Sequence, residues 1–226
     1  MYRLFILLFI AGITFNCGGE PAEETTESSP ATEEVTADES ATVLNPNLAS
    51  KEDLMALAGV DEALAQRIID GRPFLGMNGF YVLAAAAIGE SEMENFLSTC
   101  FVPLNLNSAT EAEFKMVPGV GDKMAHEFEE YRPYKKVAQF RREMGKYVDD
   151  AEIARYEKYV FVPVALNTAT DEEILAIPGV GDRMLHEFKE YRPYQSLEQF
   201  RREIGKYVDD IELERLEYYV YLDEEM

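Results

Sequence analysis

Residues 104–134 read LNLNSATEAEFKMVPGVGDKMAHEFEEYRPY, and residues 164–194 read VALNTATDEEILAIPGVGDRMLHEFKEYRPY. The two stretches lie 60 residues apart, and over a full period 35 of 60 positions are identical. A third version begins with LNPNLAS at residue 44 and matches only at framework positions, such as GRPF at 71. A fixed period of this length indicates stacked structural units. We call residues 44–103 copy one, residues 104–163 copy two and residues 164–226 copy three.

Each copy is expected to contain four short helices, and copy two shows the signals clearly. Thr110 with Glu113 has the spacing of a capping box, which begins the first helix. The turn PGVG at 118–121 ends that helix, and the second helix ends before Pro133. QFRRE belongs to a third helix, Asp149 caps a fourth, and the apolar YVFVP closes the copy as a short extended link. We therefore predict an all-α fold of three tandem 60-residue units, each a double helix-hairpin-helix of four short helices.

The charge of the chain limits its partners. The net charge is -22, whereas phosphate binding usually leaves a strongly basic segment. Residues 1–43 carry -7, copy one carries -5 and copy three carries -9. Copy two holds ten bases and eleven acids, so it alone has room for a local basic patch.

The N-terminal residues indicate export. MYRLFILLFIAGITF places one Arg before an apolar run that is too short to span a bilayer. Residues 1–17 therefore resemble a lipoprotein signal peptide in which Cys17 is lipidated, although Asn16 stands where that signal has a small residue. Ordinary cleavage and an uncleaved anchor are the alternatives. Residues 18–43 are acidic, rich in Thr, Ser and Pro and without aromatics, which predicts a disordered, extended tether. We expect an exported protein, lipid-anchored to a membrane on its periplasmic or cell-surface side.

Several recurring residues favour a structural interpretation. Cys100 aligns with valines in the other copies, which predicts a small buried side chain. Copy one keeps an arginine before the Pro of its GRPF stretch and an asparagine near its start, although its hairpin differs. The arginines are expected to bind carbonyls or carboxylates across the unit, and the asparagines to organise the turn before the first helix. These residues are Arg72, Arg132, Arg192, Asn47, Asn107 and Asn167.

The sequence indicates a protein without catalytic machinery. His126 and His186 recur in HEF, without cysteines nearby, which favours surface helical positions over metal ligands. The repeated tyrosines, among them Tyr131, Tyr134 and Tyr147, are expected to pack rather than to stack on bases. No nucleophile–base pair, phosphate-binding loop or dinucleotide fingerprint is present. We predict a protein that is not an enzyme and uses no cofactor or metal.

The whole 60-residue copy resembles the helix-hairpin-helix repeat of the ComEA competence family. The resemblance rests on LNTATDEEILAIPGVGDRM and the closing YVYL, and it is weaker in copy one. It implies an exported, membrane-associated protein that binds double-stranded DNA without sequence preference during DNA uptake. The same small fold also resembles an extrinsic subunit of photosystem II, which handles no DNA, so the fold alone does not decide the function.

The resemblance also implies which residues contact DNA. Glycine turns and the N–H groups of the following helix would hold phosphates, with nearby cations adding to the contact. The implied residues are Gly119, Val120, Gly121 and Lys123 in copy two, Gly179, Val180, Gly181 and Arg183 in copy three, and Lys146 and Lys206 in the second hairpins. Asp122 and Asp182 oppose this interpretation, because each can cap the helix itself and repel a phosphate.

Two functions therefore remain open at the level of sequence. The first is membrane-tethered, sequence-independent binding of double-stranded DNA outside the cytoplasm. The second is a structural or protein-interaction module of the cell envelope, which the acidity of the chain favours. A positive stripe that joins Lys123, Lys146, Arg183 and Lys206 would support the first function.

Overall fold

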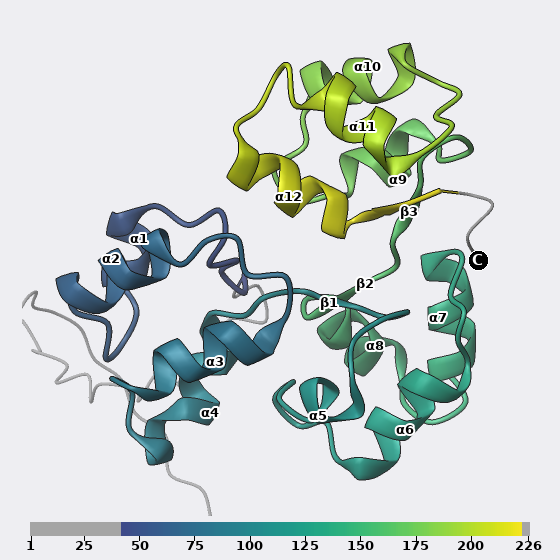
Figure 1. The fold of residues 1–226 in the computed structure, drawn as a ribbon. Helices are drawn as coiled ribbons and strands as arrows, with labels where there is room; N and C mark the ends of the chain where they lie inside the picture. The colour runs from purple at the N-terminus through teal and green to yellow at the C-terminus, as the bar shows by residue number, and fades with distance from the viewer. Residues whose placement is uncertain (1–41, 223–226) are drawn as a thin grey trace, which may run out of the picture. The chain divides into compact units, whose positions relative to one another are not determined.

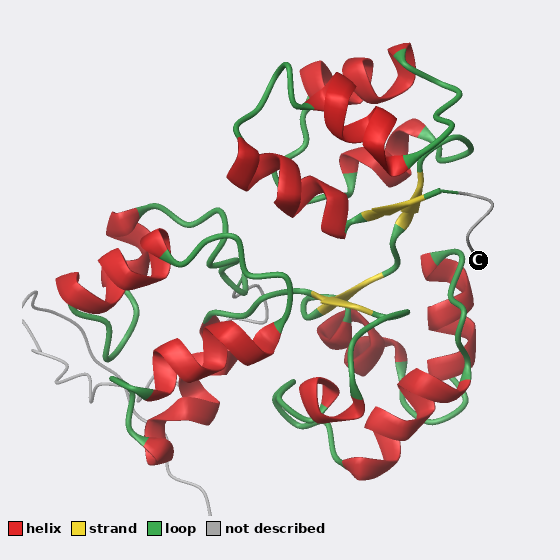
Figure 2. Cartoon of the chain, viewed as in Figure 1, coloured by secondary structure: helices red, strands yellow, loops and turns green. Residues whose placement is uncertain are grey.

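The computed structural model describes residues 42–222. The predicted signal peptide of residues 1–17, with Cys17, and nearly all of the predicted tether of residues 18–43 lie outside the described residues. Within the described residues the chain forms twelve helices and four strands of two residues each, and Figure 2 shows how far the helices predominate. The mainly helical prediction is confirmed. None of the described helices has the length and apolar character needed to cross a membrane.

The helices fall into three groups of four along the chain (Figure 1). Copy one contains α1 (Lys51–Met55), α2 (Glu62–Asp70), α3 (Met77–Ala85) and α4 (Glu90–Thr99). Copy two contains β1 (Leu104–Asn105), α5 (Glu111–Phe114), α6 (Asp122–Glu130), α7 (Val137–Met144), α8 (Asp150–Tyr156) and β2 (Val160–Phe161). Copy three contains β3 (Val164–Ala165), α9 (Asp171–Leu175), α10 (Asp182–Glu190), α11 (Leu197–Ile204), α12 (Asp210–Tyr218) and β4 (Val220–Tyr221).

Side-chain caps fix where the first helix of each group begins. Ser50, Thr110 and Thr170 each accept a hydrogen bond from the backbone N–H three residues later, and the acid at that position bonds back to the cap N–H. These reciprocal bonds satisfy two donors that a helix start otherwise leaves open. Asp149 and Asp209 likewise cap α8 and α12. The predicted caps are confirmed.

Short parallel strand pairs close each group of helices. Leu104 pairs with Val160, and Val164 pairs with Val220. In copy one a single parallel bridge joins Leu44 to Cys100, whose side chain is fully buried as predicted. The extended link that the sequence indicated is therefore half of a ladder between the first and last residues of each copy.

The recurring arginine and asparagine tie the start of each copy to the chain after the second helix. Arg132 donates through Nε to the carbonyl of Leu106 at 2.5 Å, and Arg72 and Arg192 do the same with Pro46 and Leu166. The predicted binding of carbonyls is confirmed. The asparagines differ from expectation, because Asn107 reaches beyond its local turn. It accepts from Tyr134 N–H at 2.7 Å and donates to Tyr134 carbonyl at 2.8 Å.

The apolar core is divided unequally among the copies. One cluster of buried side chains runs from Ala49 to Val160 and is shared by copies one and two, whereas copy three has a cluster of its own from Leu166 to Leu222. The Glu113 carboxylate strengthens the first connection, since it accepts from Met77 N–H at the start of α3 at 3.1 Å as well as from Thr110. The sequence copies are therefore not energetically equivalent.

Candidate functional site

The first hairpin of copy two joins α5 to α6 through Pro118 to Gly121. Gly119 has φ +77°, a left-handed backbone conformation that strongly favours glycine. Arg155 of α8 lies behind this turn, where its Nη1 donates to Pro118 carbonyl at 2.5 Å and its Nη2 is 3.1 Å from the position of a Cβ on Gly119. Gly179 has φ +82° and meets Arg215 of α12 in the same way. The first glycine of the turn thus faces the interior and serves the fold.

The second glycine of the turn has a different environment. A Cβ on Gly121 or Gly181 would meet no atom within 4 Å among the described residues, and both glycines have extended, negative-φ backbones. Copy one shows that the fold accepts a side chain here, because Asp61 occupies the same position with φ -91° and ψ 174°. Neither sterics nor backbone strain explains why copies two and three carry glycine at this point.

The practical difference lies in the N–H groups at the start of the second helix. Asp61 accepts from Leu64 N–H at 2.8 Å and so caps α2. In copy two, Gly121 is the N-cap of α6 and offers no side-chain acceptor. Within residues 42–222 no acceptor bonds the N–H groups of Gly121, Lys123 or Met124. The N–H groups of Asp61 and Ala63 in copy one are equally open, so the donor that the glycine leaves free is that of Met124, the counterpart of Leu64. A helix start of this kind attracts anions, because its donors are free and its dipole is positive there. The start of α10 at Gly181 has the same free groups.

Val120 and Val180 do not belong to this set of free donors. Their side chains are only 6% and 9% exposed and pack in the core. Their N–H groups bond the carbonyls of Val117 and Ile177 at 3.0 Å. The N–H groups of these two valines are therefore not available to a phosphate. The candidate donors that remain are the N–H groups of the glycines and of the helix start.

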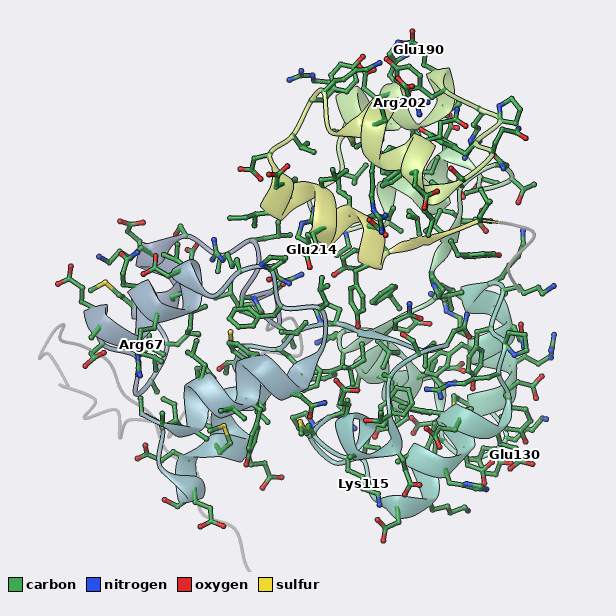
Figure 3. The ribbon with its side chains drawn as sticks, in the orientation of Figure 1. Arg67, Lys115, Glu130, Glu190, Arg202 and Glu214 are labelled. Carbon is green, nitrogen blue, oxygen red and sulfur yellow. The ribbon has the colours of Figure 1, made fainter. Side chains whose placement is uncertain are left out.

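The sequence left open that Asp122 caps α6, but in the structure Asp122 does not cap this helix. It is the first residue of the helix, and its carboxylate forms an ion pair with Lys115 at 2.7 Å (Lys115 is labelled in Figure 3). Lys115 holds the pKa of Asp122 below its ordinary value and offsets the charge that would repel a phosphate. Copy three has Leu175 in place of Lys115, and no ion pair links Asp182 to a cation in the described part of the chain. Sequence spacing gave no signal for the Lys115 contact.

The cations implied for the first hairpins are available. Lys123 and Arg183 are exposed on the first turns of α6 and α10, and no ion pair joins either to a carboxylate among residues 42–222. Lys123 Nζ instead lies 5.2 Å from the ring centroid of Tyr147, and Arg183 Cζ lies 5.9 Å from that of Tyr207.

The second hairpins differ from the first, because their backbone donors are occupied. Gly145 N–H bonds Arg141 carbonyl and Lys146 N–H bonds Glu143 carbonyl, while Asp149 caps the helix that follows. Only the side chain of Lys146 is left for a ligand, and it forms an ion pair with Glu143, as Lys206 does with Glu203. Each of copies two and three therefore presents one open hairpin rather than two.

The remaining candidates stay outside the site. His126 and His186 lie on the surface, with side chains 67% and 72% exposed, each near a glutamate one helical turn later. The described residues contain no group of three or more His, Cys, Asp or Glu placed to hold a metal ion. Cation–π contacts to a hydrogen-bonded pair of tyrosines connect Lys123 with Lys146 in copy two, and Arg183 with Lys206 in copy three. Among the described side chains, no contact continues this row of cations from copy two to copy three.

Comparisons with protein-family models, with curated proteins and with solved structures find no match to this chain.

Proposed function

We propose that the chain is an array of three tandem helix-hairpin-helix units that binds double-stranded DNA without sequence preference through the open hairpins of copies two and three. The recurrence of the arginine and asparagine bonds at a 60-residue period supports the three-unit organisation. With residues 1–17 as a lipoprotein-type signal, the array would be tethered to a membrane outside the cytoplasm and capture DNA there, as the resemblance to the ComEA family implies.

One observation carries the DNA proposal. The start of the second helix is capped by a carboxylate in copy one and left open in copies two and three, although the backbone at Asp61, Gly121 and Gly181 is equally extended. Open N–H groups beside an unpaired cation suit the phosphate backbone of a nucleic acid. Such contacts do not read bases, so the expected binding is independent of sequence.

The test exchanges the open hairpins for the closed one. In Gly121→Asp with Gly181→Asp, both turns receive the residue that copy one already carries. DNA affinity of the purified chain is measured by fluorescence anisotropy with two 20-base-pair duplexes of unrelated sequence. We expect equal affinity for both duplexes, weakening steeply as salt rises from about 50 to 200 mM, and at least a tenfold loss in the double variant.

The matched control is Ala112→Glu with Ala138→Glu. Both positions are exposed, the charge changes by the same amount, and copy three already carries Glu172 and Glu198 there. The proposal is wrong if the unchanged chain does not bind either duplex at low salt. It is also wrong if the glycine variant and the control lose affinity equally.

A protein-interaction module of the envelope is the second candidate. It is favoured by the net charge of -22 and by the -9 of copy three, which oppose association with a polyanion. Absence of DNA binding, together with a specific protein that co-purifies from the membrane fraction, is the result this candidate predicts.

A further inference from the structure

In copy two a pair of tyrosines connects the two hairpins. Tyr131 ends α6 and Tyr147 lies in the turn after α7, and their hydroxyl oxygens are 2.7 Å apart. Hydrogen bonds with Tyr131 and Glu127 raise the pKa of Tyr147, so the Tyr147 hydroxyl keeps its proton at physiological pH. Tyr191 and Tyr207 repeat the bond in copy three at 2.8 Å.

Each tyrosine carries a cation from the other hairpin. Lys123 of the first hairpin lies over Tyr147 of the second, and Lys146 of the second lies over Tyr131 of the first, with Nζ 4.5 Å from the ring centroid. Cation–π contacts of this kind attract a lysine to the face of the ring and so restrict its position. One ring face of each tyrosine is therefore taken by a lysine, which favours a role in positioning cations over stacking on bases.

Copy one lacks the whole arrangement. At the corresponding positions it has Ala63, Gly71, Ala86 and Ala87, in place of Lys123, Tyr131, Lys146 and Tyr147. Yet copy one keeps the arginine and asparagine bonds of the framework. The fold therefore does not need the tyrosine–lysine cluster. The cluster is absent from the same copy whose helix start is capped by Asp61, which suggests that the two features serve one purpose.

The balance of charge at the cluster favours an anionic ligand. Glu143 is the main opposing group, and it is shared between Lys146 and Arg142, whose Nη2 lies 2.6 Å from the carboxylate. Glu127 faces the tyrosine hydroxyls from α6. Three cations (Lys123, Arg142 and Lys146) thus face two carboxylates, within a chain that is acidic overall.

We propose that this cluster is a second phosphate position in each open unit. Tyr131 and Tyr147, with their counterparts Tyr191 and Tyr207, act as positioning residues that hold two cations beside the helix start. The inference rests on the proposed function. Lys123 lies over Tyr147 and Lys146 lies over Tyr131, and the two ring centroids are 6.5 Å apart. A ligand that contacts both lysines as well as the helix start is expected to carry phosphates at more than one point. This requirement identifies the ligand class as a nucleic-acid strand rather than a free nucleotide or an inorganic anion.

The test removes the second position and keeps the first. In one variant Lys146→Ala, Tyr147→Ala, Lys206→Ala and Tyr207→Ala import the alanines of copy one. The salt dependence of affinity for a 20-base-pair duplex is measured, since each phosphate contact contributes about -0.9 to the slope of log K against log salt. We expect the slope to become shallower by about two, one contact for each copy.

A second variant guards against loss of structure, because the tyrosines are half-buried. Lys146→Gln with Lys206→Gln changes only exposed side chains and keeps both hydroxyl bonds; we expect the same change in slope. The inference is overturned if both variants keep the original slope and affinity while Gly121→Asp with Gly181→Asp abolishes binding, a result that leaves the proposed function standing. If the unchanged chain binds no duplex, the proposed function fails and this inference fails with it.

Discussion

At the scale of single residues, one position decides whether the first hairpin is open. Asp61 places a carboxylate on Leu64 N–H, whereas Gly121 and Gly181 place nothing there. Glycine in place of an N-cap carboxylate costs roughly a few tenths of a kcal/mol of helix stability, so the open helix start has a small cost. We interpret that cost as the consequence of keeping the helix start free for an external anion.

Glu143 gives a prediction at the same scale. Lys146 and Arg142 hold the pKa of this carboxyl below its ordinary value, so it is ionised at neutral pH and neutralises both cations. Glu143→Gln keeps the shape of the side chain and removes its charge. We expect affinity for duplex DNA to rise roughly two- to fivefold, because Lys146 and Arg142 are then no longer neutralised by a carboxylate. Fluorescence anisotropy at low salt measures the change.

Its control is Glu214→Gln. Glu214 is exposed on α12 (Figure 3) and forms no ion pair among the described residues, so the substitution changes the net charge equally. If the two variants bind DNA with the same affinity, the ion pairs of Glu143 with Lys146 and Arg142 do not weaken DNA binding, and the prediction is wrong.

At the scale of elements, spacing in the sequence predicts the helices well. Capping boxes depend on residues three apart, so Thr110 with Glu113 is enough to locate the start of α5. Two-residue strands show no alternation, which is why the ladder between Leu104 and Val160 could not be predicted. The sequence also does not show whether a backbone N–H group is free to bind a ligand, because the group can bond a carbonyl three or four residues earlier. The occupied donors of Gly145 and Lys146 show this.

The candidate site was predictable only in part for the same reason. The glycine turns and Lys123 follow from a local motif that copies two and three display. The contacts of Lys115 with Asp122, of Arg155 with Pro118 and of Tyr131 with Tyr147 join separate elements, so they depend on the angle between helices. A single sequence contains no signal that fixes those angles.

At the scale of the whole molecule, the two core clusters predict unequal coupling. Phe140 and Phe200 occupy the same position of the repeat, and both are at most 1% exposed. Truncating either to alanine should cost about 3–5 kcal/mol. Because Phe140 belongs to the cluster shared by copies one and two, Phe140→Ala should speed amide hydrogen exchange throughout residues 44–163. Phe200→Ala should speed exchange in residues 164–222 alone.

Hydrogen exchange followed by mass spectrometry of peptides measures this difference directly. Equal acceleration across all the described residues in both variants would mean that the chain unfolds as one cooperative unit. In that case the division of the core would have no energetic consequence.

The central claim is that the open hairpins contact phosphate, and nuclear magnetic resonance tests it most directly. A short duplex is titrated into the ¹⁵N-labelled chain at low salt, and the amide signals are followed residue by residue. The account predicts shifts at Gly121, Lys123 and Met124 and at their counterparts in copy three, larger in copy two because copy three is more acidic. The amide of Leu64 in copy one, which Asp61 caps, should not move. Shifts confined to other surfaces, or none at any hairpin, would contradict it.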